Sequence, residues 1–424
     1  MEFFDCKQAA QDGPGGVYME LLKMRVIKAH VALWTTLLVS SLVLSACQPG
    51  SLGLPSSSST NKPIVSKPPL TANVNGEKVG NGPNRIALLL PLTASGGAGI
   101  AAKQIANAAR MALAEFGANS LQLVIKDTRG QSSAASLAAS EARTEGATLV
   151  LGPLFSANVN SASAVTQPSG LPMIAFSSDQ ARARAGVYLL SFAPQADIER
   201  TLTYGLSNGA DKIVAILPST NYGSLVEREM RRIVSRGNGE VVSVARYGPS
   251  ANEIVSAANS IALQMADANA IYIPSGSEVP GLVLNSLKRA GVNLEGKQVM
   301  GSGQWKGLDV KSPVFEGAFH AGNNERNFAT FASRYKSKYG SDPLATAALG
   351  YDAVSLAAEL VRRNPQQPFT RDAIQSRAGF NGASGLFRFQ STGKLERGLA
   401  IYRVSGGNAA IASPAPSRFV TQNR

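Results

Sequence analysis

The sequence predicts an α/β protein with two doubly wound lobes. From Arg85 onward, short apolar runs alternate with segments of helical periodicity. Continuous apolar strands that are each followed by a helix are typical of a parallel sheet covered on both faces. In the second half of this region strand starts recur about every 29 residues, the length of one strand–helix unit. Two such series indicate two lobes.

The individual elements follow from these patterns. The first strand series starts at Arg85, Gln122, Thr148, Pro172 and Val187, and the second starts at Lys212, Glu240, Ala270 and Gln298. Helices are expected over Ile100–Phe116, Ser132–Glu145, Ala196–Asn208, Leu225–Ser235, Glu253–Met265, Gly281–Ala290, Phe328–Tyr339 and Thr346–Arg363. Within the fourth helix, Val226, Met230, Ile233 and Val234 share one face. Two further strands with a turn at Gly393 should follow.

The first 46 residues are expected to be a leader with a lipoprotein signal peptide. Lys23, Arg25 and Lys28 precede the apolar run from Val31 to Leu44, which has the length of a signal peptide core. The following Leu44-Ser45-Ala46-Cys47 resembles the lipobox of bacterial lipoproteins, so Cys47 is expected to carry lipid. An ordinary signal peptide with an incidental cysteine is the alternative.

Residues 47–84 are predicted to be a disordered tether. Gln48–Asn84 is rich in Ser, Pro, Gly and Asn and has no hydrophobic periodicity, so it cannot bury a core. The folded domain is expected over 85–404, and 405–424 is expected to be a polar tail.

Composition favours binding over catalysis. After Cys47 the chain has a single histidine, His320, which argues against zinc sites and Ser-His or Cys-His catalysis. Gly97-x-Gly99 lies too late after its strand for a dinucleotide site, and no cofactor is expected. The net charge is +13, but no run interleaves arginines with aromatics as nucleic-acid grooves do. Two interpretations of the positive charge remain: a basic solvated surface, or attraction to anionic lipids or wall polymers.

Any ligand should lie at the carboxyl ends of the strands. Parallel sheets bind ligands there, because helix amino termini present unpaired N–H groups at that edge. Short hydroxyl residues are frequent in the corresponding loops, where each could also simply cap a helix. These loops are Thr93–Gly97, Gly152–Ser156, Ser177–Asp179, Asn221–Tyr222, Ser275–Glu278 and Ser302–Gln304.

The order of several segments resembles the type I periplasmic solute-binding proteins, the leucine/isoleucine/valine-binding group. The segments are RIALLLPLTASGG, IKDTRGQSSAASLAASEARTEGATLVLGPLFS, LPMIAFSS, NYGSLVEREM and GASGLFRFQSTGKLERGLAIYRV. The resemblance implies two Rossmann-like lobes joined by three crossover strands, near Ala193–Pro194, Ala321–Asn324 and Pro365–Pro368. Lobe one would comprise 85–192 and 323–364, and lobe two 193–322 and 365–404.

The resemblance also implies a ligand site between the lobes. Ser156 matches the serine that holds the main chain of an amino-acid ligand, Ser177 and Ser178 fall where small residues line the site, and Tyr222 matches a cleft tyrosine. Three positions depart from the pattern. Asp179 replaces the usual threonine, and Gln304 stands near the place of an acidic residue that pairs with the ligand's ammonium group. Gly276 replaces a common aromatic wall.

Two functions follow from the resemblance. The first is a lipid-anchored receptor that delivers a small solute, such as an amino acid or a wall fragment, to an ABC permease. The second is an envelope lipoprotein that activates a penicillin-binding peptidoglycan synthase by protein contact, since the chain is also similar to such activators. Both place the protein on the periplasmic face of the envelope, and Gln48 after Cys47 favours the outer membrane.

Overall fold

The computed structural model describes residues 70, 73–323 and 325–419. All of them belong to one compact unit, Val65–Arg424. The predicted signal peptide, Cys47 and most of the predicted tether lie outside the described residues. No helix among the residues described has the length and apolar character needed to cross a membrane.

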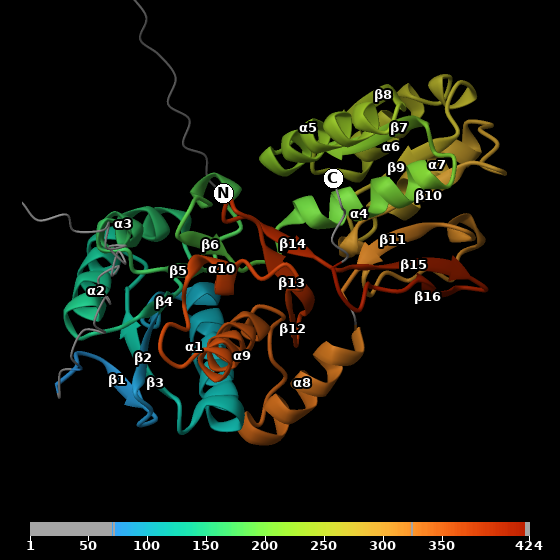
Figure 1. Cartoon of the computed structure of the whole chain (residues 1–424). Coiled ribbons are helices and arrows are strands. Elements are labelled where there is room, and N and C mark those ends of the chain that lie inside the picture. Colours follow the sequence, from blue (N-terminus) through green and yellow to red (C-terminus); the bar gives the residue numbers. More distant parts are fainter. Residues whose placement is uncertain (1–69, 71–72, 324, 420–424) are drawn as a thin grey trace, which may run out of the picture. The chain divides into compact units, whose positions relative to one another are not determined.

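Lobe one is built on a six-stranded sheet of order β1-β3-β2-β4-β5-β6 (Figure 1). Every neighbouring pair is parallel except β1–β3. The strands are β1 Glu77–Val79, β2 Asn84–Leu90, β3 Leu121–Asp127, β4 Leu149–Leu151, β5 Met173–Ala175 and β6 Val187–Leu189. The helices between them are α1 Gly96–Ala112, α2 Ser132–Thr144 and α3 Ser156–Thr166.

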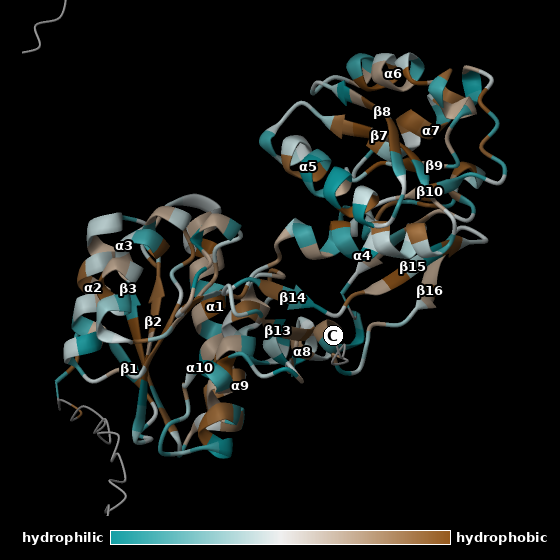
Figure 2. Cartoon of the chain, turned by 45° about the horizontal axis from the view of Figure 1, so that its top comes forward, coloured by the Kyte–Doolittle hydropathy of each residue, from teal (hydrophilic) through white to brown (hydrophobic). Residues whose placement is uncertain are grey.

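Helices cover both faces of this sheet, as the continuous apolar strands predict. Ile86, Leu88 and Leu90 of β2 pack with α1 and α9 (Ala347–Arg363), whereas the alternate residues Ala87 and Leu89 pack with α2 and α3. This alternation is the period of two of a strand buried on both sides. Figure 2 shows β2 and β3 as apolar strands among these helices.

Lobe two repeats the plan on a seven-stranded sheet of order β16-β15-β11-β10-β9-β7-β8. Its strands are β7 Lys212–Pro218, β8 Glu240–Tyr247, β9 Ala270–Tyr272, β10 Gln298–Met300, β11 Phe319–Gly322, β15 Ala400–Ser405 and β16 Asn408–Ser413. The helices α4 Pro194–Ser207 and α5 Asn221–Arg236 cover one face, and α6 Ala251–Ser260 and α7 Val279–Arg289 the other. The predicted buried face of α5 is confirmed.

The third crossover is not at Pro365–Pro368, which corrects the predicted boundary. After α8 (Glu325–Tyr339) and α9, the chain forms α10 (Arg371–Ile374) and a small sheet of β12 Phe380–Gly382, β13 Gly385–Phe389 and β14 Leu395–Arg397. Phe369, Phe380 and Phe387 belong to the core of lobe one, whereas Leu399 belongs to lobe two. The chain therefore crosses at Gly398–Leu399, and 365–397 belongs to lobe one.

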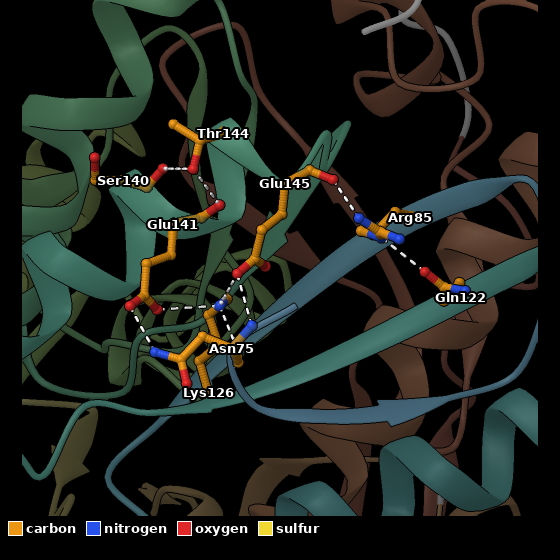
Figure 3. Close-up of polar contacts among 8 residues, drawn as sticks. All are labelled: Asn75, Arg85, Gln122, Lys126, Ser140, Glu141, Thr144 and Glu145. Atoms are coloured by element: carbon orange, nitrogen blue, oxygen red, sulfur yellow. Dashed lines mark hydrogen bonds and ion pairs between the residues drawn. The ribbon is translucent and has the colours of Figure 1, made fainter. Parts of the chain in front are cut away.

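The predicted tether also ends earlier than Asn84. Strand β1 pairs with β3, and Asn75 joins a buried polar cluster (Figure 3). The ammonium group of Lys126, which is 3% exposed, donates to Glu145 at 2.9 Å, to Glu141 at 3.1 Å and to the Asn75 carbonyl. Asn75 N donates to Glu145 Oε1 at 2.8 Å. These contacts fix the amino-terminal segment to lobe one.

The predicted polar tail is likewise partly structured. Strand β16 (Asn408–Ser413) pairs antiparallel with β15, which extends the sheet of lobe two. The single predicted strand after Gly393 is in fact two, since β14 stays in lobe one and β15 lies in lobe two.

Candidate functional site

The six predicted ligand residues line two separate cavities. Ser156, Ser177, Ser178 and Asp179 line a cavity of about 450 Å³ that we term the lobe-one cavity. Tyr222 and Gln304 line a cavity of about 490 Å³ that we term the crossover cavity. Residues of all three crossovers line the latter, and Phe192 of the first crossover lines both.

Local backbone geometry presents Ser156 at the start of α3. Gly152, directly after β4, has a φ of +79°, and a Cβ at this position would lie 2.2 Å from the carbonyl oxygen of Leu89. Only glycine fits this close approach to β2. The loop that follows leads into α3, so Ser156 lies at the carboxyl edge of the sheet, as predicted.

Ser156 and Asp179 of the lobe-one cavity are hydrogen-bonded to each other and to the neighbouring Arg182. The hydroxyl groups of Ser191 and Thr346, which also line this cavity, have no partner among the described residues. Ser156 Oγ donates to Asp179 Oδ2 at 2.5 Å, and Arg182 Nε donates to both Ser156 Oγ and Asp179 Oδ2 at 3.0 Å. Asp179 N donates to Ser177 Oγ at 3.2 Å. The hydrogen bond from Ser156 lowers the pKa of Asp179, with a further contribution from Arg182. The Ser156 hydroxyl group therefore already donates its hydrogen bond within the chain, to the ionised carboxylate of Asp179.

The predicted residues of lobe two are held more weakly. Tyr222 OH donates to the carbonyl oxygen of Pro274 at 3.4 Å, and Gly276 N donates to Gln304 Oε1 at 3.4 Å. Burial raises the pKa of Tyr222 to about 12. A Cβ at Gly276 would lie 2.4 Å from the Gln304 carbonyl oxygen. The turn at Gln304 thus fills the space that an aromatic wall would need.

Asp197, which the sequence did not single out, lines the crossover cavity together with a second, exposed acid, Glu325. Asp197 lies in the first turn of α4, and its Oδ2 accepts from Gly303 N at 2.7 Å. Its Oδ1 is buried and has no hydrogen-bond partner among the residues described. Burial raises the pKa of Asp197 to about 7. From sequence alone an acid here is indistinguishable from one that complements the helix dipole.

A tyrosine lies close to this carboxylate. The hydroxyl group of Tyr272, at the end of β9, is fully buried and unpartnered within the described part of the chain. Burial raises the pKa of Tyr272, and the Asp197 charge adds to the effect there and at Tyr222. Buried polar groups without partners are rare in folded proteins. Of the two residues, Asp197 lines the crossover cavity, where a polar ligand or water would complete its hydrogen bonding.

A buried arginine ties the crossovers together. Arg397 Nε donates to the Ser191 carbonyl oxygen at 3.0 Å, and its Nη1 donates to Ser384 Oγ at 2.9 Å. Ser384 in turn contacts Asp352 of α9, which also accepts from Ala383 N at 2.6 Å. Burial lowers the pKa of Arg397 to about 10. The first and third crossovers are thereby joined to lobe one at the edge of the crossover cavity.

Metal ligation and histidine chemistry find little support in the described ranges. No group of three or more His, Cys, Asp or Glu residues lies close enough there to hold a metal ion. His320 of β11 is buried, stacks on Tyr402 with ring centroids 5.5 Å apart, and contacts the Ala321 carbonyl oxygen through Nδ1. The polar side chains that line the two cavities can bind a polar solute.

Several solved structures share this architecture. A candidate branched-chain amino acid ABC transporter protein from Rhodospirillum rubrum has a TM-score of 0.66 at 21% identity, over 77% of this chain and 99% of its own. An ABC transporter substrate-binding protein from Desulfitobacterium hafniense in complex with Leu has a TM-score of 0.54 at 18% identity, over 77% and 99%. A solute-binding protein of an ABC transporter from Rhodopseudomonas palustris BisB5, in complex with 3,4-dihydroxybenzoic acid, has 0.52 at 17%, over 79% and 97%.

At these identities the structures establish the fold alone. No curated protein matches the chain. The family model for periplasmic binding proteins, however, matches residues 83–409, which include most of both lobes, all three crossovers and both cavities. The chain therefore belongs to the periplasmic binding protein family.

Proposed function

We propose that the chain captures a small solute bearing an amine or another cationic group in the crossover cavity and delivers it to an ABC permease. The observation that carries this is the Asp197 carboxylate, which lines that cavity with one buried oxygen unpartnered among the described residues. A buried carboxylate is costly when it has no counter-charge, and a cationic ligand group would relieve that cost. Amino acids and related amines are the class that fits best.

Asp197 also supplies the counter-charge that the sequence left unassigned near Gln304. Its Oδ2 accepts from Gly303 N, directly before Gln304, and both residues line the crossover cavity with Tyr222. The neighbours from D. hafniense and R. palustris, which hold leucine and 3,4-dihydroxybenzoic acid, support a small organic solute. Of these two ligands, Asp197 favours the one that carries an amine, the amino acid, over the aromatic acid.

The lobe-one cavity is not expected to take a free carboxylate at Ser156. A ligand carboxylate within hydrogen-bond reach of Ser156 would approach Asp179, since those two side chains are 2.5 Å apart. Two like charges about 4 Å apart repel by about 4 kcal/mol at an effective dielectric constant near 20. Arg182 offsets part of this repulsion, because it pairs with Asp179.

The test is a thermal-shift and calorimetry screen with matched probes: L-leucine, L-leucinamide and 3,4-dihydroxybenzoate. An amine at 100 times its Kd should add about 2.7 kcal/mol to the free energy of unfolding. Asp197→Asn should abolish the response, whereas Asp267→Asn, an exposed acid of the same lobe, should preserve it. Binding of the dihydroxy acid alone, unchanged in Asp197→Asn, would contradict the proposal.

A second candidate function is activation of a penicillin-binding peptidoglycan synthase by protein contact. It is favoured by the lobe-one cavity, whose Ser156, Asp179 and Arg182 already satisfy one another and need no solute. Full-length protein that responds to no probe but raises the rate of a purified synthase would establish this function instead. In both cases we propose a lipid anchor at Cys47 and a periplasmic location, with the outer membrane favoured, which mass spectrometry of the membrane-extracted protein would check.

A further inference from the structure

The carboxyl-terminal segment Pro414–Phe419 passes from lobe two back to lobe one. It starts where β16 ends, at Ser413, which pairs with Ile401 of β15 in the sheet of lobe two. Arg200 of α4 fixes this starting point. Its Nη2 donates to Ser413 Oγ at 2.7 Å, and its Nε donates to the carbonyl oxygen of Leu399 at 2.9 Å. The segment therefore begins beside the third crossover.

The middle of the segment lies against that crossover. A Cβ placed on Gly398 would meet Cγ of Pro416 at 3.0 Å and Cδ of the same ring at 3.2 Å. Gly398 N donates to the carbonyl oxygen of Leu386 in β13 at 2.8 Å, which holds the crossover strand to the small sheet. The absence of a side chain at Gly398 is what lets Pro416 approach so closely.

The end of the segment packs on lobe one. The Phe419 ring lies 4.3 Å from the guanidinium carbon of Arg388, within the range of a cation–π contact. A Cβ at Gly379 would lie 2.8 Å from Phe419 Cδ2. Arg388 is itself positioned by its ion pair with Glu396, with Nε and Oε2 2.8 Å apart. Phe419 thus packs against the small sheet, on an Arg388 side chain that Glu396 already holds in place.

We propose that Pro414–Phe419 is a strap that ties the two lobes and restrains their relative motion, with Phe419 as its latch. Two-lobe binding proteins move as hinges about the residues that join the lobes. Here a fourth connection runs alongside the third crossover, anchored by Arg200 and Ser413 on lobe two and by Arg388 on lobe one. Movement of the lobes away from each other must break one of these contacts. Release of the latch should therefore increase the range of lobe separations.

The test measures the distance between the lobes directly and needs no ligand. Spin labels are attached at Lys103→Cys in α1 and Lys288→Cys in α7, both exposed, in the full chain with Cys6 and Cys47 replaced by serine. Double electron–electron resonance then compares this chain with Phe419→Ala and with a chain ending at Ser413. Phe116→Ala, which removes an exposed phenylalanine of lobe one away from the strap, is the matched control.

Phe419→Ala should raise the population of the wider separations about two- to fivefold, the ratio supplied by an ordinary cation–π contact at a partly exposed site. The truncated chain should show at least the same rise, and Phe116→Ala none. Superimposable distance distributions for the truncated and parent chains would overturn the strap. An equal rise in Phe116→Ala would overturn it as well.

Discussion

The two lobes share one plan but treat their buried charges differently. In lobe one, Lys126 is surrounded by Glu141, Glu145 and the Asn75 carbonyl, so its charge is fully paired. In lobe two, Asp197 has a single hydrogen bond, from Gly303 N, and one buried oxygen without a partner in the described residues. A charge paired within the chain stabilises the fold, whereas an unpaired one is suited to a ligand. The difference lies in the counter-charge: Glu145, whose Oε2 also lacks a hydrogen bond, is ion-paired with Lys126, whereas Asp197 forms no ion pair with any described residue.

The largest effect is expected when the paired charge of lobe one is removed. Lys126→Met leaves the carboxylates of Glu141 and Glu145 close together without their cation, and breaking such a buried pair costs about 3 kcal/mol. Urea unfolding at pH 7 measures this loss. Lys103→Met, an exposed lysine of α1, should change the stability little. Equal midpoints for the two variants would show that the cluster does not stabilise lobe one.

Removal of the unpaired charge of lobe two, at Asp197, should have the opposite effect and raise the stability of the ligand-free protein near neutral pH. The pKa of Asp197 is raised from 3.8 to about 7, so the folded protein binds more protons than the unfolded chain between those values. The parent should therefore lose stability as the pH rises from about 4 to 7, by roughly 2–4 kcal/mol, and this loss should be absent in Asp197→Asn.

Urea midpoints from pH 4 to pH 8 test this difference. Without ligand, Asp197→Asn should become the more stable protein near neutral pH. A difference between variant and parent that stays constant across the range would mean that Asp197 is not buried as an unpaired acid.

A matched pair of tyrosines isolates the unpartnered hydroxyl group. Tyr272 OH has no partner among the described residues, whereas Tyr247 OH donates to Ser275 Oγ at 2.5 Å. Since a buried hydroxyl without a hydrogen bond is unfavourable, Tyr272→Phe should stabilise the ligand-free protein by about 1 kcal/mol, and Tyr247→Phe should destabilise it by a similar amount. Thermal unfolding measures both. Destabilisation of equal size in the two variants would show that Tyr272 is satisfied in solution.

The sequence was informative where apolar periodicity decides the structure. All nine predicted strand starts lie within two residues of observed strands, because parallel strands buried on both faces must be continuously apolar. The third crossover was misplaced because Pro365–Pro368 suggests a linker, whereas Phe369, Phe380 and Phe387 return the chain to lobe one. Short exposed strands such as β16 carry no such pattern.

The site was less predictable than the fold. Strand-end loops indicated where Ser156, Asp179, Tyr222 and Gln304 would lie, but not that they divide between two cavities. Asp197 escaped notice because its importance depends on burial and on the missing partner of Oδ1, which only the tertiary structure defines. A pattern in sequence reveals which residue types meet at an edge, but not which of their hydrogen bonds are already made.

The smallest expected effect concerns the satisfied cluster of the lobe-one cavity. The hydrogen bond from Ser156 lowers the pKa of Asp179, so this group stabilises the fold above its ordinary pKa of 3.8, and the contribution is lost as the pH falls through the lowered value. Ser156→Ala should raise the pKa of Asp179 toward 3.8, as carboxyl-carbon NMR titration would show. Because Asp179 is 38% exposed, the cost in stability should stay below about 1 kcal/mol.

Ser178→Ala, an exposed neighbour in the same cavity, should leave that pKa unchanged. An Asp179 that titrates alike in all three proteins would show that the hydrogen bond from Ser156 is not made in solution, and would remove the contrast between this satisfied carboxylate and Asp197.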